Sequence, residues 1–246
     1  MPYQSFARFY DGLTANVDYD ALANRVHHII TQHKDKCELV LDLACGTGSL
    51  AQRLARMGYE VIGVDASAEM LMEASAKNAE LDHPVLYLCQ PMEQLDLFGT
   101  IDAVVCTLDS INHVTDEPAL QEAVRRVALF LEPGGLFLFD SNTPYKHREV
   151  LGDNAFIYEN EDVVCLWQNS VLVDGLTVQV ELDFFSQAGK GLYSRHSESF
   201  CEKAYSREFL TELLEKAGLR LLSVTDEDGA APRQDSQRLQ YLAIKD

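Results

Sequence analysis

Short apolar segments alternate with amphipathic helical segments over residues 18–142, and this alternation restricts the fold more than any other feature of the chain. The expected strands cover 38–48 (ending in glycines), 59–65, 85–90, 101–109 and 136–142, and the expected helices cover 18–33, 49–58, 66–81 and 117–131. Strands and helices joined by short connections predict a Rossmann-like, doubly wound α/β fold with a mostly parallel sheet. In such a sheet, ligands bind beyond the carboxyl ends of the strands.

The pattern changes after Pro144, where apolar and polar residues alternate and no long helix intervenes. The segments 155–173, 175–187 and 192–205 predict antiparallel strands, with a hairpin turn at Asp174-Gly175. A helix at 206–218 and strands at 219–228 and 238–246 follow, and the last strand should be antiparallel because its connection holds no helix. We therefore expect one domain from residues 1–144 and 202–246. Residues 145–201 would form an inserted antiparallel β layer, either a substrate lid or a dimerisation subdomain.

A glycine turn after the first expected strand is the strongest motif. In LVLDLACGTGSLA, Gly46 and Gly48 lie between strand and helix, where glycine permits a positive φ and lets a ligand approach the backbone. Seventeen residues after Gly48, the next strand ends in Asp65, whose carboxylate can accept hydrogen bonds from the hydroxyls of a ribose. The combination predicts a site for a nucleoside-containing ligand.

Two ligand classes compete for this turn. The spacing of Gly46, Gly48 and Ala51 also fits the dinucleotide fingerprint, which would indicate a NAD(P)-linked oxidoreductase. Asp42 ends the strand four residues before Gly46, close to where a pyrophosphate would lie, and its carboxylate would repel the phosphates. The same carboxylate suits a ligand that bears an ammonium and a sulfonium, so we favour S-adenosylmethionine (SAM).

LDLACGTG followed by GVDASAEML resembles the cofactor-binding core of the class I SAM-dependent methyltransferases. The resemblance covers most of residues 39–143, and YSREFLTELLEKAGLRLLSV is similar to a late helix and strand of that family. The N-terminal YQSFARFYDGL with DYDAL, together with the β insertion, looks most like small bacterial methyltransferases of uncharacterised acceptor. The resemblance implies SAM as cofactor and methyl transfer as the reaction.

Site roles follow from this resemblance. Asp42 would lie near the ammonium of SAM, the loop from Ala44 through Gly46 and Gly48 would pass its methionine part, and Asp65 would hold the ribose hydroxyls. The remaining implied cofactor contacts are Ala66, Met70, Gln90, Pro91 and Met92 around the adenine, Leu108, Asp109 and Ser110 at the methionine and acceptor end, and the lid tyrosines Tyr10 and Tyr19.

Pro91 departs from the family, because many members have an acidic residue there that accepts from the adenine amino group. Proline offers neither a side-chain acceptor nor an N–H, so we expect Gln90 or a backbone carbonyl to replace that contact. The lid tyrosines have an alternative role in simple packing of the N-terminal segment against the core.

Methyl transfer is an in-line displacement, and it needs a general base only when the acceptor carries a proton of high pKa. Asp109 and His113 are the catalytic candidates, and His113 could act as base at neutral pH or have no chemical role. Further candidates for acceptor contacts in and near the insertion are Tyr158, Trp167, Arg195, His196 and Tyr205. The alternative to catalysis is a protein that binds SAM without turnover.

A net charge of −19 disfavours nucleic acid and anionic membranes as direct partners, which leaves a small-molecule acceptor by default. No apolar run reaches the length of about 18 residues that spans a bilayer, and the N-terminus does not resemble a secretory signal. The six cysteines have neither disulfide-framework nor zinc-ligand spacing, so we expect no metal site and a cytoplasmic protein. A homodimer through the β insertion stays open.

Overall fold

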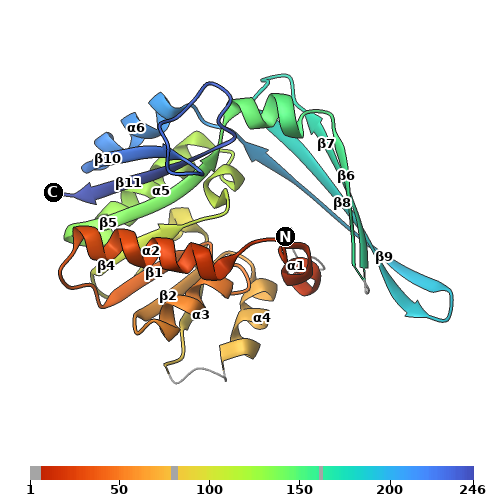
Figure 1. Ribbon diagram of the computed structural model, residues 1–246, viewed down its shortest axis with the longest axis horizontal. Coiled ribbons are helices and arrows are strands. Elements are labelled where there is room, and N and C mark those ends of the chain that lie inside the picture. The colour runs from red at the N-terminus through yellow and green to blue at the C-terminus, as the bar shows by residue number, and fades with distance from the viewer. Residues whose placement is uncertain (1–6, 79–82, 161–162) are drawn as a thin grey trace.

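A seven-stranded sheet forms the centre of the computed structural model, which describes residues 7–78, 83–160 and 163–246 (Figure 1). The strand order is β10-β11-β5-β4-β1-β2-β3. The strands are β1 (Leu39–Leu43), β2 (Glu60–Asp65), β3 (Leu86–Cys89), β4 (Ile101–Cys106), β5 (Leu131–Asn142), β10 (Leu219–Asp226) and β11 (Arg238–Lys245). Neighbouring strands run parallel except at β11, which is antiparallel to both β5 and β10. The predicted doubly wound sheet with an antiparallel last strand is confirmed.

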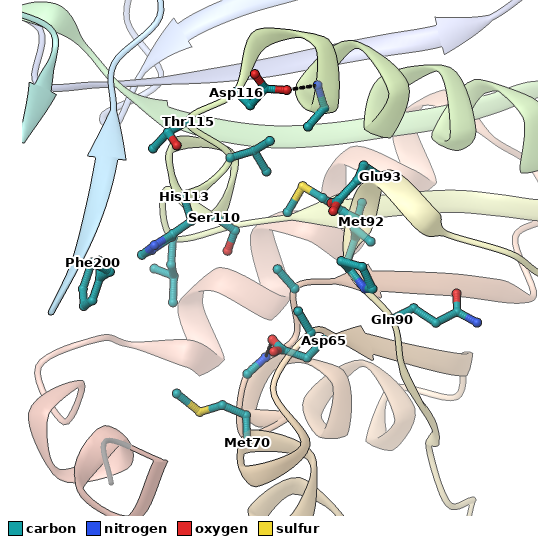
Figure 2. Close-up of a pocket in the computed structure, with 18 of the residues that line it drawn as sticks. Asp65, Met70, Gln90, Met92, Glu93, Ser110, His113, Thr115, Asp116 and Phe200 are labelled. Atoms are coloured by element: carbon teal, nitrogen blue, oxygen red, sulfur yellow. Dashed lines mark hydrogen bonds between the residues drawn. The ribbon is translucent and has the colours of Figure 1, made fainter. Parts of the chain in front are cut away.

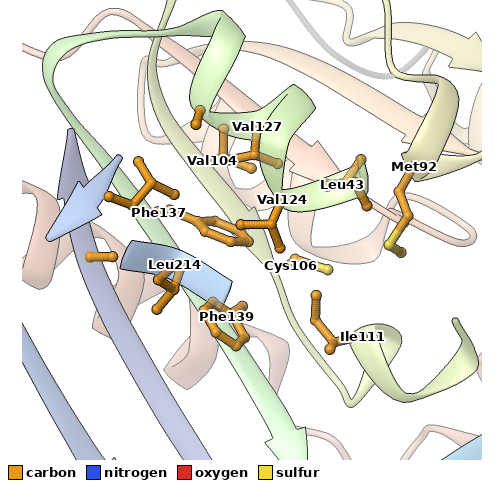
Figure 3. Close-up of a cluster of buried hydrophobic side chains, with 14 of the residues drawn as sticks. Leu43, Met92, Val104, Cys106, Ile111, Val124, Val127, Phe137, Phe139 and Leu214 are labelled. Carbon is orange, nitrogen blue, oxygen red and sulfur yellow. The ribbon is translucent and has the colours of Figure 1, made fainter. Parts of the chain in front are cut away.

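Helices cover both faces of this sheet. They are α2 (Tyr19–His33), α3 (Ser49–Arg56), α4 (Ala68–Asn78), α5 (Glu117–Phe130) and α6 (Arg207–Lys216). Successive strand residues point to opposite faces, so Ala103 and Val105 pack with α2 and α3, whereas Val104 packs with α5 and α6. Figure 3 shows the second of these cores, where Val124 and Leu214 meet Phe137. Burial on two faces explains why the strands are almost uniformly apolar.

Several expected boundaries differ from the structure by a few residues, and the fifth strand shows the clearest difference. The fifth strand was expected from residue 136, but β5 begins at Leu131, directly after α5, and includes the Pro-Gly-Gly segment. Gly134 has a φ of +77°, and a Cβ on Gly135 would lie 2.8 Å from the carbonyl oxygen of Glu132, so the glycines let the chain bend while it stays in the sheet. The helix expected over 66–81 is α4, and its last three expected residues lie outside the described residues.

A separate antiparallel sheet follows the fifth strand, as the sequence predicts, in the order β6-β7-β8-β9. It contains β6 (Ala155–Glu159), β7 (Val163–Val171), β8 (Thr177–Gly189) and β9 (Leu192–Lys203), so the segment expected at 155–173 contributes two strands. The short helix α1 (Ala7–Leu13) lies between the two sheets (Figure 1). Phe9 on α1 stacks on Phe184 of β8, and this contact fixes α1 against the inner face of the second sheet.

Three short helical segments connect these elements: the 3₁₀ helices η1 (Met92–Gln94) and η2 (Ser110–His113), and the π-helix η3 (Lys146–Leu151). Among the residues described, none of the helices is both long and apolar enough to span a lipid bilayer.

Candidate functional site

A pocket of about 410 Å³ opens at the carboxyl ends of β1, β2 and β4, where the sequence predicts the ligand. Figure 2 shows Gln90 and Glu93 at one end and His113 and Phe200 at the other. Its described lining residues are Tyr10, Leu43, Ala44, Gly46, Asp65, Ala66, Met70, Gln90, Pro91, Met92, Glu93, Leu108, Ser110, His113, Val114, Thr115, Asp116, Ala119, Phe200 and Cys201. The central sheet, α1 and β9 therefore all contribute to one cavity, whose volume suits a small-molecule ligand.

The two glycines of the turn differ in whether they line this pocket. Gly46 has a φ of +53° and lines the cavity, and its Cβ position would lie 3.8 Å from the ring of Tyr10. Gly48 does not line the pocket. A Cβ on Gly48 would lie only 2.2 Å from the hydroxyl oxygen of Tyr87, so this glycine is needed for packing between the turn and β3. Ala44 lines the pocket with a φ of +60°, a conformation that a non-glycine residue adopts at a cost.

Asp65 fixes the turn from the end of β2. Its Oδ2 accepts a hydrogen bond from the backbone N–H of Gly46 (2.8 Å), and its Oδ1 accepts one from the N–H of Ser67 (2.8 Å). Each carboxylate oxygen can accept a second bond, so the side chain can bind a pair of ligand hydroxyls as well. Burial raises the pKa of Asp65, while these two backbone donors oppose that shift.

Asp42 lies under the turn instead of in the pocket wall. The side chain is buried, its carboxyl accepts a bond from the backbone of Ala51 at the start of α3, and its Oδ2 has no hydrogen-bond partner among the described residues. Burial raises the pKa of Asp42 to about 7. An ionised Asp42 would place an uncompensated negative charge close to the pocket, which suits a cationic ligand.

The N-terminal segment reaches the turn through α1. Tyr10 lines the pocket and shares a side-chain hydrogen bond with Tyr19, which itself lies outside the lining set. Asp11 accepts hydrogen bonds from Thr47 Oγ1 (2.5 Å) in the glycine turn and from Lys77 Nζ (2.7 Å) on α4. Asp11 was not among the predicted site residues, because only the fold brings these three side chains together.

The end of the pocket where the adenine is expected differs from the prediction at Gln90. Gln90 lines the pocket, but its amide is paired with residue 96: Oε1 accepts from the N–H of Asp96 and Nε2 donates to its carbonyl. Glu93, which no sequence motif indicated, also lines this end and offers the carboxylate that Pro91 lacks. Ala66, Met70 and Met92 lie at the pocket wall as expected.

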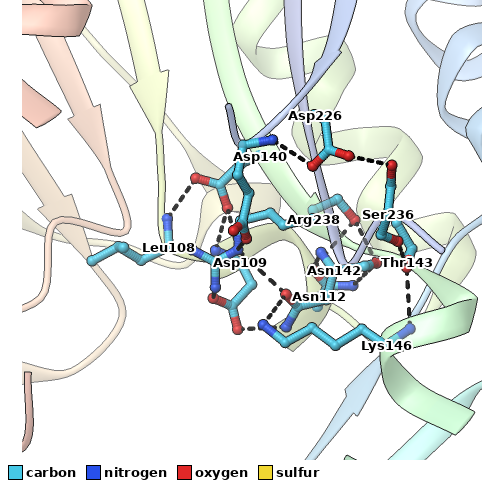
Figure 4. Close-up of polar contacts among 12 residues, drawn as sticks. Leu108, Asp109, Asn112, Asp140, Asn142, Thr143, Lys146, Asp226, Ser236 and Arg238 are labelled. Carbon is cyan, nitrogen blue, oxygen red and sulfur yellow. Dashed lines mark hydrogen bonds and ion pairs between the residues drawn. The ribbon is translucent and has the colours of Figure 1, made fainter. Parts of the chain in front are cut away.

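A strained turn after β4 shapes the opposite end. Leu108 and Asp109 both have a positive φ, of 58° and 55°. The buried carboxylate of Asp140 holds this turn, accepting from the N–H of Leu108 (2.8 Å) and of Asp109 (2.6 Å). Leu108 and Ser110 line the pocket, whereas Asp109 does not: its carboxylate accepts bonds from Arg238 and from Asn142 Nδ2 (Figure 4).

His113 lies between the pocket and a group of charged side chains. About a third of its side-chain surface is exposed (33%), and desolvation by the surrounding protein lowers its pKa. Its ring is 5.3 Å from that of Phe200, and its Nε2 lies 3.6 Å from Oε1 of Glu202, a buried residue of β9. Burial, with Asp109 nearby, raises the pKa of Glu202 to about 8. No motif in the sequence pointed to Glu202 or Phe200, because β9 follows the glycine turn by about 150 residues.

The other candidates of the insertion lie outside the lining set. Arg195 forms a two-bond ion pair with Asp183, and Trp167 Nε1 donates to Asn169. The hydroxyl of Tyr205 donates to the carbonyl oxygen of Val114, which is a pocket residue, so Tyr205 supports the wall. Tyr158 is packed near Trp167, and His196 lies near Phe9 of α1.

The charge of the pocket can be compared with the chemistry of a ligand. Three carboxylate residues, Asp65, Glu93 and Asp116, line it, and no lysine or arginine does among the described residues. A phosphate-bearing dinucleotide would meet only negative charge there, whereas a ligand with an ammonium and a sulfonium would be attracted. The charge of the lining residues therefore fits SAM.

Comparisons with known proteins agree with this geometry. The sequence pattern of the methyltransferase domain family matches residues 40–135. A Bacillus subtilis (strain 168) protein that carries the name methyltransferase YqeM is 35% identical over 247 residues, which cover all of this chain and 98% of that protein. The crystal structure of a SAM-dependent methyltransferase from Clostridium acetobutylicum superposes with a TM-score of 0.89 at 31% identity, covering 99% of this chain and 98% of that one. The sugar N-methyltransferase KedS8 from a Streptoalloteichus species shares the fold, with a TM-score of 0.79 at 24% identity over 98% of this chain and 92% of its own.

Proposed function

Because this chain belongs to the class I SAM-dependent methyltransferases, we propose that it transfers the methyl group of SAM to a small-molecule acceptor by in-line displacement. The cofactor supplies a methyl carbon that is already activated by a positively charged leaving group. The protein's main contributions are then alignment and exclusion of water. The observation that carries the proposal is the pocket itself, with Gly46 and Asp65 at its centre and three carboxylates in its wall.

Residue roles form part of the proposal. Asp65 would hold the ribose hydroxyls with the acceptor positions that its two backbone bonds leave open. Gly46 and Ala44 would pass against the methionine part, while Ala66 and Met70 would contact the adenine and Glu93 would accept from its amino group. Tyr10 would cover the cofactor, with Tyr19 holding the Tyr10 hydroxyl in place. The face of an aromatic ring attracts a sulfonium, so Tyr10 also suits this ligand electrostatically.

Gly48 and Asp42 have indirect roles in this proposal. Gly48 would keep the turn close to β3, and Asp42 would supply negative charge from below the turn without touching the cofactor. Leu108 and Ser110 would border the reacting groups, and the buried carboxylate of Asp140 would hold this turn through the N–H groups of Leu108 and Asp109. In this proposal, the motif residues outside the pocket wall support the site indirectly.

A small acceptor is favoured by the size of the pocket, whose volume is about 410 Å³. Helix α1 contributes Tyr10 to its lining, and β9 contributes Phe200 and Cys201. The net charge of −19 disfavours a nucleic acid acceptor. The likeness to a sugar N-methyltransferase, although limited to the fold, includes the four-stranded sheet and is compatible with this size class.

We also propose a cellular location and an oligomeric state. All six cysteines are free thiols in the fold, which supports a reducing, cytoplasmic location. Exposed apolar side chains on the four-stranded sheet, including Ile157, Leu192 and Tyr193, support a homodimer through this sheet. Light scattering of the purified protein would measure the oligomeric state.

Methyl-labelled SAM tests the proposed acceptor class. The protein is incubated with labelled SAM and either the small-molecule fraction or the macromolecular fraction of a bacterial extract. We expect label in the small-molecule products, and at least about tenfold less label in a control that contains the Asp65→Ala variant at subsaturating SAM. Label confined to protein or RNA would contradict a small acceptor, although it would leave the methyltransferase assignment intact.

A further inference from the structure

Three polar side chains converge behind the acceptor end of the pocket. One carboxylate oxygen each of Asp109 and Glu202, together with a ring nitrogen of His113, lie within 4.8 Å of one another. A point therefore exists about 2.8 Å or less from all three atoms, the distance at which an ammonium nitrogen donates hydrogen bonds. His113 is the open side of this cluster, since its side chain is 33% exposed against 5% for Glu202.

Glu202 supplies an independent observation. Its side chain is almost entirely buried, and among the described residues the nearest basic group to its carboxylate is His113 Nε2 at 3.6 Å, too far for a hydrogen bond. Buried carboxylates are normally hydrogen-bonded, so this one is arranged for a donor that arrives from elsewhere. The neighbouring Phe200 ring adds a face that attracts cations.

The charges around the cluster indicate which donor fits. Besides Asp109 and Glu202, the charged groups around it are Asp140 of β5, Glu227, Lys146 of η3 and Arg238 of β11. Four carboxylates thus stand against two fixed cations, which leaves negative charge to be compensated. An ammonium compensates part of this charge, and its three N–H groups can donate to all three atoms of the cluster.

We propose that Asp109, His113 and Glu202 form the subsite that receives the amino group of an amine acceptor, which enters as an ammonium ion. This inference rests on the proposed function and names the substrate class of the same site. Burial keeps the pKa of Glu202 near 8 in the empty protein, so the arriving cation ionises it and releases its proton. His113, whose pKa is lowered by desolvation, is neutral and can accept a proton from the ammonium.

The methyl transfer to an amine conserves atoms and charge. The ammonium R–NH₃⁺ gives one proton to the ring nitrogen of His113, and the freed lone pair forms the bond to the methyl carbon. The carbon–sulfur bond breaks, its electron pair stays on sulfur, and S-adenosylhomocysteine leaves with the methylated ammonium R–NH₂⁺–CH₃. His113 then returns its proton to water through its exposed side. In this sequence His113 is the catalytic base, and Asp109 and Glu202 bind the substrate.

Matched ligands test the subsite directly. The full-length protein, saturated with S-adenosylhomocysteine, is titrated with cyclohexylamine, cyclohexanol and cyclohexanecarboxylate in HEPES and in phosphate; Tris is omitted because it is itself an amine. We expect the amine to bind at least about tenfold more tightly than the other two. At pH 7, binding should release protons, seen as a heat that differs between the two buffers. Equal binding of the alcohol, preference for the carboxylate, or no binding of the amine would overturn the proposal.

Two variants test whether Glu202 is a residue that binds the amine. Glu202→Gln should weaken amine binding at least about tenfold and abolish the proton release, while the matched control Glu181→Gln, an exposed position on β8, should change neither. Unchanged amine binding in folded Glu202→Gln would contradict the subsite. If that variant does not fold, the preference of the wild type for the amine over the alcohol tests the subsite instead.

Two further titrations distinguish the amine subsite from a metal site and from a failure of cofactor binding. Titration with Zn²⁺ or Mg²⁺ alone should show no binding that Glu202→Gln removes, and micromolar binding that displaces the amine would replace the amine subsite with a metal site. S-adenosylhomocysteine should bind Glu202→Gln as it binds the wild type, because Glu202 lies outside the cofactor pocket. Loss of cofactor binding in the wild type would instead contradict the proposed function, so the two failures are distinguishable.

Discussion

At the scale of single residues, Asp65 has two tasks that can be measured separately. It holds the glycine turn through Gly46 and Ser67, and we propose that it binds the ribose hydroxyls of SAM. Asp65→Ala should weaken SAM binding at least about tenfold in calorimetry. It should also lower the free energy of unfolding in urea by about 1.5–3 kcal/mol, since a charged acceptor is lost from the turn. Undiminished SAM affinity in the folded variant would remove Asp65 from the site.

Asp42 predicts a pH dependence. Burial raises its pKa to about 7, so the group is protonated below that pH and ionised above it. SAM carries positive charge and is favoured by the ionised form, so its affinity should rise as the pH rises from 6 to 8. Asp42→Asn should remove this rise. A wild-type affinity that falls or stays constant over this range would show that the charge of Asp42 does not reach the cofactor.

Gly48 tests whether the turn needs glycine for packing or for its backbone conformation. Gly48→Ala places a Cβ 2.2 Å from the Tyr87 hydroxyl and forces alanine to a φ of +74°, so we expect a loss of about 2–4 kcal/mol in urea unfolding. Gly134→Ala is the matched control, since its φ is +77° and its Cβ would meet nothing within 4 Å. Equal losses in both variants would exclude packing against Tyr87 as the cause.

At the scale of elements, α1 is the part of the site that depends most on tertiary contacts. Seven residues are too few for a stable isolated helix, so its position depends on Asp11, Phe9 and the sheets around it. Asp11→Ala should weaken SAM binding by about three- to tenfold and increase amide hydrogen exchange in α1. Asp20→Ala, which removes an ion pair from α2 instead, should leave both quantities unchanged. Wild-type exchange in the Asp11 variant would show that α1 is held by apolar packing alone.

Most of the elements could be predicted from the sequence, because each carries a local signal. Strands buried on both faces give continuous apolar runs, and the Asp174-Gly175 turn marks the hairpin between β7 and β8. The motif residues that line the pocket, such as Gly46 and Asp65, could be predicted for the same reason. Phe200, Glu202 and Asp11 could not be, since their positions depend on how β9 and α1 pack across the strand ends.

The same dependence on tertiary contacts explains why two predicted site residues have other partners than expected. Asp109 was expected at the reacting groups, but the strained turn directs its carboxylate to Arg238, far along the chain on β11. Gln90 or a backbone carbonyl was expected to replace an acidic side chain, and a local pairing with Asp96 engages the amide of Gln90. In both cases the side chain pairs with a residue that the sequence spacing does not predict. This pairing determines which further bonds the side chain can make.

At the scale of the whole molecule, a parallel sheet, α1 and a second, antiparallel sheet share one cavity. In the proposed function the parallel sheet supplies the cofactor contacts, and β9 lines the pocket with Phe200 and Cys201 on the side proposed for the acceptor. This division predicts that changes in the second sheet alter acceptor binding and leave cofactor affinity intact. The amine subsite shares only His113 with the residues that line this pocket, where the proposed cofactor contacts lie.

Isothermal titration of the purified protein with SAM, S-adenosylhomocysteine and NADH decides which cofactor the glycine turn binds. Because three carboxylates and no lysine or arginine line the described pocket, the two methionine-derived ligands should bind with micromolar affinity and NADH should not bind. Binding of NADH without SAM would contradict the methyltransferase function, and the glycine turn would then have to be assigned to a pyrophosphate.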